Sequence, residues 1–441
     1  MNRTTACFCL IALLGCSNIV KADSAIELLS GFDHDRIEAA YPPGNAKTFG
    51  ELAKMVYRMG SVSRDLVAKK ANSDPAEIGD AISIEGTIVS LRTLRVPESL
   101  VEFLEFPVFQ DAVVQVGDDQ TKLINVIASR LPTGAKAGDR VEAVGILIQG
   151  DSGEVATPAM VSTPMKWFPK APKSAGWQLL SGAGVDVSEL AQVATRNKLP
   201  LSTEDNEAFY QMLSVSDEIG QSPVAAQVEP TWIEPVELLQ SPNDHIGDWV
   251  RMRLQTVRVT RIAIDDPKRR DQLGSDHYFQ IDANGDLNGV IIRVPRADDD
   301  PGEPIQFDGT YPVSLVTTKL PDFLVDAIRR QEGGEVVTSM ITTPIQIEGF
   351  FFRLWSYSTE FMERRGAGKQ VGPLLMVARM TDRSRVGQGG IGAEIFGYIA
   401  AVAIIGGILG TLIWSRYVSR EDRQVREKQQ LRDSERIDLP G

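Results

Sequence analysis

The chain has 441 residues, with 46 Lys and Arg against 59 Asp and Glu and a formal net charge of −13. A surface of this charge repels nucleic acid and anionic headgroups, so the composition predicts no nucleic-acid partner. The three cysteines, Cys7, Cys9 and Cys16, lie in a segment that we expect to be removed. The mature chain is therefore expected to fold without an internal disulfide.

Residues 1–22 have the features of a signal peptide. Arg3 precedes an apolar run over residues 6–16, and Val20-Lys21-Ala22 follows as a cleavage site, which predicts an exported body. An alternative is that Leu13-Leu14-Gly15-Cys16, which resembles a bacterial lipobox, directs lipidation of Cys16. The mature chain has neither cysteine nor an Asn-x-Ser/Thr acceptor, which favours a bacterial source.

Residues 23–170 are predicted to form a helix followed by a small β unit. Apolar residues recur at helical spacing within residues 49–70, at Leu52, Met55 and Met59. After Ile78-Gly79-Asp80 the pattern changes to apolar runs of strand length. The predicted strands cover residues 81–96, 109–116, 122–129, 140–148 and 156–165.

A linker, residues 171–202, separates this unit from a second one, residues 203–382. A short helix is expected within the linker at residues 185–197, because Asp186 and Glu189 stand at capping spacing. The second unit is expected to begin with a helix over residues 204–218. Its predicted strands cover residues 249–264, 278–282, 289–294, 311–318 and 336–347, with two extra strands at 349–357 and 372–380.

Three short sequence matches recur in the same order in the two units. They pair residues 57–63 with 210–216, Ile78-Gly79-Asp80 with Ile246-Gly247-Asp248, and residues 160–164 with 340–344. Collinear matches of this kind indicate an internal duplication.

We therefore expect an α+β chain, mainly β, built from two tandem helix-plus-small-β-barrel units and followed by a single transmembrane helix. Five strands with a long first strand are typical of OB-like Greek-key barrels. A β-sandwich is the alternative that the strand pattern leaves open. The aromatic stripe at residues 349–357 is expected in the core, with a partner-binding face as the alternative.

Residues 395–414 carry no charge and are long enough for the roughly 20 apolar residues of a membrane span. A linker, residues 383–394, precedes them. Arg416, Arg420 and Arg423 follow, so the positive-inside rule places the charged tail, residues 415–441, in the cytoplasm. This predicts a single-pass protein of the plasma (inner) membrane, held in the lipid bilayer with its N-terminal body exported.

Four small residues in this span stand at four-residue spacing: Gly397 with Ala401, and Gly406 with Gly410. Small residues at that spacing let two membrane helices approach closely. The pattern allows a homodimer through the transmembrane helix; the alternative is that these residues have no role in association, because glycine is common in membrane spans anyway.

A search for catalytic chemistry finds no established motif. Each of the three histidines, His34, His245 and His277, stands beside an aspartate, a pattern typical of solvated loops. No zinc-protease helix, nucleophile elbow or phosphate loop occurs, so we expect no enzymatic activity and no cofactor. Paired carboxylates, as in glycosidases, are the alternative, because their separation cannot be read from a sequence.

One acidic segment has part of a calcium-loop pattern. Asp282, Asn284, Asp286 and Asn288 place oxygen-bearing side chains at alternate positions, as a hard cation requires. Arg293 stands where a closing glutamate is needed, however. A hairpin turn through Asn284 and Gly285 is the alternative.

These features together favour a non-enzymatic binding or scaffold protein of a bacterial envelope, with a protein or glycan as its partner. The alternative is a membrane-tethered hydrolase that acts on envelope glycan or peptide through carboxylates.

Overall fold

The structure is a computed structural model that describes residues 25–384 apart from residues 72–76, 118–121, 130, 132–133, 151–156, 295, 297–302, 327–337 and 366–368. The predicted signal peptide and the predicted span, with Gly397, Ala401, Gly406 and Gly410, lie outside the described residues. No helix of the described part is long and apolar enough to cross a bilayer.

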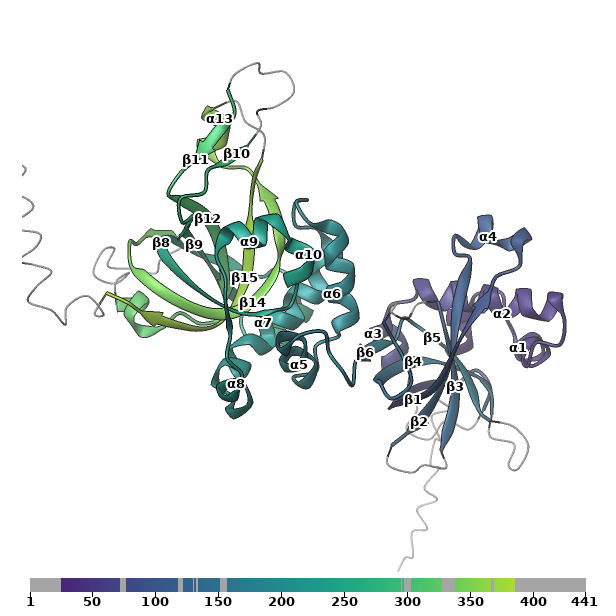
Figure 1. Ribbon diagram of the computed structural model, residues 1–441. Helices are drawn as coiled ribbons and strands as arrows, with labels where there is room; N and C mark the ends of the chain where they lie inside the picture. Colours follow the sequence, from purple (N-terminus) through teal and green to yellow (C-terminus); the bar gives the residue numbers. More distant parts are fainter. Residues whose placement is uncertain are drawn as a thin grey trace, which may run out of the picture.

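The N-terminal part places short helices before a set of strands (Figure 1). The helices are η1 (Ala25–Leu29), α1 (His34–Ala40), α2 (Ala46–Ser61), α3 (Arg64–Lys69) and α4 (Glu98–Leu104). The strands are β1 (Ala81–Arg95), β2 (Val108–Val116), β3 (Leu123–Ala128), β4 (Arg140–Gln149), β5 (Ala159–Ser162) and β6 (Lys166–Phe168). Helix α2 begins at a capping box in which Asn45 and Thr48 each accept the other's backbone N–H.

Strands β1 to β5 close into a five-stranded barrel, called here the first barrel. Their order is β1-β2-β3-β5-β4, and β4 pairs back with β1. Every neighbouring pair is antiparallel except β3 and β5, which are parallel. Strand β6 pairs with the start of β4, so that Trp167 lies opposite Val141. The fold is thus mixed α/β and mostly β, with a closed, OB-like five-stranded barrel.

Both faces of the first barrel are buried. Ile84, Ala112 and Val126 belong to an interior cluster. Alternate strand residues such as Ile127 belong to a second cluster, which contains the predicted helix stripe of α2. Since Met55 and its neighbours in that stripe are almost fully buried, α2 is held to the barrel by apolar burial.

The C-terminal part follows through a helical connector (Figure 1). Its helices are α5 (Ala175–Gly182), α6 (Val187–Val193), η2 (Ala194–Arg196), η3 (Thr203–Asp205), α7 (Asn206–Gln221), α8 (Pro223–Gln227), α9 (Pro235–Gln240), α10 (Pro242–His245), α11 (Pro267–Leu273) and α13 (Glu360–Arg364). Its strands are β7 (Thr231–Trp232), β8 (Trp249–Ala263), β9 (His277–Asp286), β10 (Ile292–Val294), β11 (Ile305–Phe307), β12 (Thr310–Thr317), β13 (Thr338–Met340), β14 (Pro344–Tyr357) and β15 (Gln370–Asp382).

Five of these strands form a second barrel. Their order is β8-β9-β12-β15-β14, and β14 pairs back with β8. Strands β12 and β15 are parallel and the other neighbours are antiparallel. Strand for strand, this is the order and direction found in the first barrel.

The two barrels also share local irregularities. The first strand of each has a register shift against the second strand, between Ile88 and Ser90 in β1 and between Thr256 and Arg258 in β8. A bulge of this kind re-aims a strand so that it can close a barrel.

The Gly-Asp openings occupy the same place as well. Gly79 and Gly247 both have positive φ angles, of 93° and 76°. Gly79 donates its N–H to the carbonyl of Leu147 in β4 at 2.8 Å, and Gly247 donates to Phe351 in β14 at 2.7 Å. Each glycine therefore fastens the start of the first strand to the fourth strand.

Several predicted strands of the second unit are corrected. Residues 349–357 and 372–380 are not extra strands, because β14 and β15 are the fourth and fifth barrel strands. Residues 289–294 supply only β10, which pairs with β11 outside the barrel. The match of residues 160–164 with 340–344 is not structural: Met160 lies in the fifth strand of its barrel, and Met340 lies in β13, before the fourth strand of the other.

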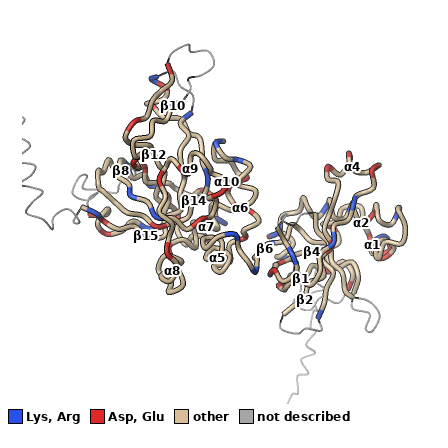
Figure 2. The backbone as a smooth tube through the Cα atoms, in the orientation of Figure 1, with Lys and Arg blue, Asp and Glu red and all other residues tan. Residues whose placement is uncertain are grey.

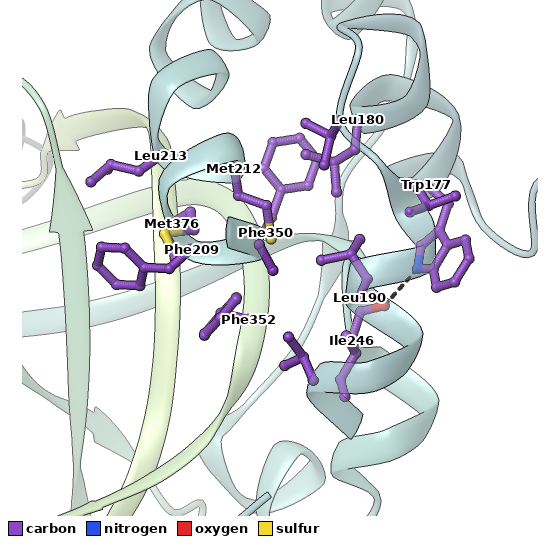
Figure 3. Close-up of a cluster of buried hydrophobic side chains, with 14 of the residues drawn as sticks. Trp177, Leu180, Leu190, Phe209, Met212, Leu213, Ile246, Phe350, Phe352 and Met376 are labelled. Atoms are coloured by element: carbon purple, nitrogen blue, oxygen red, sulfur yellow. Dashed lines mark hydrogen bonds between the residues drawn. The ribbon is translucent and has the colours of Figure 1, made fainter. Parts of the chain in front are cut away.

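Helix α7 covers the outer face of β14 and β15 (Figure 3). Phe209 and Met212 of α7 point toward Phe350 and Phe352, and the rings of Phe209 and Phe352 meet edge to face with centroids 5.8 Å apart. Since Phe350, Phe351 and Phe352 are all fully buried, the aromatic stripe belongs to the core. Burial on both faces explains why this strand reads as a continuous apolar run.

The connector joins the barrels through one carboxylate and one aromatic pair. Asp186 caps α6 by accepting the N–H of Ser188 and also accepts the N–H of Trp167, both at 3.0 Å. The rings of Trp167 and Trp177 pack edge to face, 6.3 Å apart. Lys268 of α11 adds an ion pair to Asp65 of α3 at 2.5 Å.

Candidate binding groove

A polar groove of about 530 Å³ lies on the second barrel. It is formed where β9 and β15 end and where β12 and β14 begin, next to the middle of β8. The lining residues are Arg253, Leu254, Gln255, Asn284, Asp286, Thr310, Pro344, Ile345 and Arg383.

Strand register brings these side chains together. Gln255 of β8 lies opposite Asn284 on one side and opposite Pro344 on the other. Leu254 and Ile345 are buried in the barrel, so their neighbours in the alternating pattern face outward. Polar side chains such as Gln255 therefore face the groove, and the buried side chains of Leu254 and Ile345 lie beneath them.

An exposed tryptophan stands beside the groove. Strand β7 pairs with β8 and places Trp232 opposite Arg251, with 43% of Trp232 exposed. The guanidinium of Arg253 lies 4.7 Å from the centre of the indole ring, which is cation–π distance. The ring holds Arg253 in position without neutralising its charge.

Two arginines of the groove lack an ion-pair partner among the described residues, namely Arg253 and Arg383. Their neighbours differ: Arg251 binds Glu348 at 2.8 Å, and Arg258 binds Asp282 at 2.5 Å. Figure 2 shows positive and negative residues interspersed over both barrels, so these two guanidiniums are a local feature rather than part of a wide basic face.

The other wall of the groove is acidic. Asp286 accepts the N–H of Asn288 at 2.7 Å. Nearby, burial raises the pKa of Glu234, and the charges of Asp286 and Glu237 act in the same direction, whereas a hydrogen bond with Asn288 and the charge of Arg253 act to lower it. The groove is thus lined by two guanidiniums, of Arg253 and Arg383, and by one carboxylate, of Asp286.

The four calcium candidates are placed along one extended segment. Asp282, Asn284 and Asp286 lie in β9, and the strand runs past the turn expected at Asn284 and Gly285. Asp282 is engaged by Arg258 and by the amide of Gln280. Asn288 follows in the turn with a φ of 49°. An extended strand spreads these oxygens instead of gathering them around one point, although Asn284 and Asp286 share the groove.

No group of three or more His, Cys, Asp or Glu side chains in the described part is arranged to hold a metal ion. Of the histidines, His277 contacts both Asp276 and Ser275 through the same ring nitrogen, Nδ1. A catalytic triad needs the nucleophile and the orienting carboxylate on opposite ring nitrogens of the histidine, so this cluster lacks the geometry of a triad. His245 contacts Asp248 at 3.2 Å, and His34 is the first residue of α1.

A second cleft, of about 220 Å³, lies between α3, the connector and α7. Its acidic residues include Asp186 and Glu207. Burial raises the pKa of Asp186. Burial also acts to raise the pKa of Glu207, but hydrogen bonds from Gln211 and Arg269 outweigh it and lower that pKa. Gln211 bridges the two, accepting the N–H of Asp186 and donating to Glu207.

The sequence did not single out Arg253, Arg383 or Trp232. Arg253 and Arg251 alternate with buried residues in β8, which marks them as outward-facing. Only the paired strands show which of the outward arginines has a partner.

No protein-family model matches this chain, and no curated protein does. Among solved structures, the chain is similar to the crystal structure of fission yeast Pot1 and ssDNA. The likeness has 10% sequence identity and a TM-score of 0.17, and it covers 71% of this chain and 85% of that chain.

From the sequence we expected no nucleic-acid partner, and this expectation is corrected. The structure to which the chain is similar contains single-stranded DNA. At this identity and TM-score the likeness identifies no DNA-contacting residue in the present chain.

Proposed function

We propose that this protein is a non-enzymatic binding protein made of two tandem OB-like modules, residues 23–170 and 203–382. The groove of the second module is its ligand site. The observation that carries this proposal is the pair of guanidiniums that have no ion-pair partner among the described residues, set among side-chain amides and a hydroxyl in an open groove. Such groups bind a polar ligand through charge-assisted hydrogen bonds.

The duplication is supported by features that chance would not repeat together. The barrels share strand order, the parallel third and fifth strands, the bulge in the first strand, and the glycine hydrogen bond to the fourth strand. The helix before each barrel contacts equivalent strands as well, with α2 on β3 and β5 and α7 on β12 and β15. With two copies of the module, one copy can keep a structural role while the other binds a ligand.

The setting we propose is a bacterial envelope. Residues 1–22 would export the chain, and residues 395–414 would anchor it in the inner membrane with the modules outside the cytoplasm. Fractionation tests this: the full chain should stay in the membrane pellet after carbonate washing, and deletion of residues 395–414 should release it. A full chain that washes off would contradict the anchor.

Binding is tested with purified full-length protein in detergent against a panel of neutral, cationic and anionic small molecules, by calorimetry. We expect at least one member to bind and Asn284→Ala with Thr310→Ala to weaken it. Asn125→Ala, in β3 of the first barrel, is the matched control. Absence of binding across the panel, or binding indifferent to the groove variants, would contradict the proposal.

A second candidate function is hydrolysis by carboxylates, which one observation favours. Asp186 and Glu207 line one cleft with their pKa values moved in opposite directions, as in acid–base pairs. Turnover of an envelope glycan or peptide that disappears in Asp186→Asn, with binding in the groove intact, would establish this function in place of the first.

A further inference from the structure

Strand register allows the groove to be compared with its counterpart in the first barrel. Gln255 pairs with Pro344 as Thr87 pairs with Arg140. Counting along these strands places Glu85 at the position of Arg253 and Arg140 at the position of Pro344. That same fourth-strand position is paired with Phe168 of β6 in the first barrel, and in the second it is hydrogen-bonded to Arg383, directly after β15.

In the first barrel this place is closed by the chain itself. Arg140 forms an ion pair with Glu85 across the strands. Its guanidinium also lies 3.9 Å from the centre of the Phe168 ring. The charge of Arg140 is therefore neutralised by a neighbouring carboxylate, and its guanidinium stacks on a ring.

In the second barrel the corresponding residues leave the place open. An arginine replaces the glutamate, and proline replaces the arginine that would pair with it. A second arginine replaces the phenylalanine. Among the described residues neither Arg253 nor Arg383 has an ion-pair partner, and the groove between them measures about 530 Å³.

We infer that the groove of the second barrel binds a carboxylate or phosphate group, carried by a small organic molecule or by the end of a larger one, and that the first barrel does not bind it. This inference rests on the proposed function and names its ligand class. Planar guanidiniums pair with such oxyanions through two parallel hydrogen bonds. The volume fits a ligand of small-molecule size.

The rest of the groove defines the remainder of the ligand. Gln255, Asn284 and Thr310 offer amides and a hydroxyl to hydrogen-bonding groups. Asp286, with Glu234 behind it, accepts donors such as hydroxyl groups and repels a second anion. The ligand is thus an anion that also carries hydrogen-bond donors.

The test uses full-length protein in detergent and three probes: inorganic phosphate, D-glucuronate and a short oligothymidylate. Calorimetry measures each affinity for wild type, Arg253→Gln and Arg383→Gln. We expect phosphate or glucuronate to bind and each variant to weaken that binding by roughly tenfold or more, the effect of losing one charge-assisted contact. Arg258→Gln, an arginine of the same strand paired with Asp282, and Arg140→Gln should leave it unchanged.

Three outcomes would overturn the inference: no probe binds, binding ignores Arg253 and Arg383, or Arg140→Gln weakens binding equally. Binding of oligothymidylate alone, with the same dependence on both arginines, would assign the oxyanion to a nucleic-acid phosphate and overturn the small-molecule ligand. If neutral molecules of the wider panel bind in the groove while these probes do not, the proposed function stands and this inference fails. The triple change Arg253→Glu, Pro344→Arg and Arg383→Phe copies the first barrel and should abolish binding without unfolding the chain.

Discussion

The indole of Trp177 lies directly against Gly247. Its Nε1 donates to the carbonyl of Ile246 at 2.7 Å, and a Cβ added to Gly247 would stand 2.7 Å from that same nitrogen (Figure 3). The backbone of Gly247 also has a positive φ angle, which side chains with a Cβ disfavour. Gly247 thus allows the connector helix to pack on the entry of the second barrel, together with Gly176 of α5, where an added Cβ would clash with the carbonyl oxygen of Gly247.

We expect Gly247→Ala to lower the free energy of unfolding by about 2–4 kcal/mol, because it adds overpacking to backbone strain. Gly79→Ala has the strain of a positive φ, and we expect it to cost about 1–2 kcal/mol. Gly182→Ala is the control, since nothing lies within 4 Å of its added Cβ. Urea denaturation measures all three. Equal effects for Gly247→Ala and Gly182→Ala would refute the packing argument.

The fully buried Arg353 fastens the segment before α7 to β14. It donates to the carbonyls of Leu199 and Pro200 and forms an ion pair of 2.7 Å with Asp205. Arg353→Met leaves a buried carboxylate and carbonyls without that donor, so we expect a loss of about 3–5 kcal/mol. The exposed pair of Arg364 with Glu360 provides the control, and Arg364→Met should change stability by less than about 0.5 kcal/mol. A similar, small effect of both changes in denaturation would contradict the role of Arg353.

Asp205 makes part of this stability depend on pH. Burial acts to raise the pKa of Asp205, but hydrogen bonds from Arg353 and Arg196 outweigh it, so the folded pKa lies below the ordinary value near about 4. A lowered folded pKa contributes stability that is complete above the unfolded pKa and is lost as pH falls through the folded one. The stability difference between wild type and Asp205→Asn should therefore be constant near neutral pH and shrink below about pH 4. If the stability difference between wild type and Asp205→Asn grew on acidification, the pKa of Asp205 would be shifted in the opposite direction and the account would be wrong.

Substitution of Phe352 tests which contacts hold α7 on the second barrel. It is fully buried against Phe209, so we expect Phe352→Ala to cost about 3–5 kcal/mol. Phe361 is 46% exposed and contacts Phe307, and we expect Phe361→Ala to cost below about 1 kcal/mol. Hydrogen exchange in α7 should speed up only in the first variant. Unchanged exchange there would mean that α7 is held by other contacts.

Much of the fold could be predicted from the sequence because its signals are local. The helical stripe around Met55 and the alternation after Gly79 identify α2 and β1, although the helix expected over residues 49–70 is broken at Val62 and Ser63 into α2 and α3. Strands of the second barrel were misassigned where the local sequence pattern does not show the strand. Residues 350–352 are buried on both faces and show no period of two, and Gly349 resembled a break although it lies within β14, where strand β15 approaches its backbone closely.

The groove was harder to predict because it depends on pairing across strands. Asn284 and Asp286 attracted attention as oxygen-rich positions, and both do line the groove. Their cationic neighbours, Arg253 and Arg383, come from distant strands, and nothing local distinguishes them from the paired Arg251 and Arg258. Whether a charge is free or neutralised is decided by register, which a single sequence does not display.

The central claim is that, among the described residues, the compared position carries guanidiniums without an ion-pair partner in the second barrel, whereas in the first barrel its arginine is paired. Arginine footprinting of the full-length protein with phenylglyoxal, with and without inorganic phosphate, tests it residue by residue. We predict that Arg253 and Arg383 react readily and that phosphate protects both, whereas Arg140, held by Glu85 and Phe168, reacts slowly with or without phosphate. Equal reactivity of the three arginines, or protection of Arg140 alone, would contradict the account.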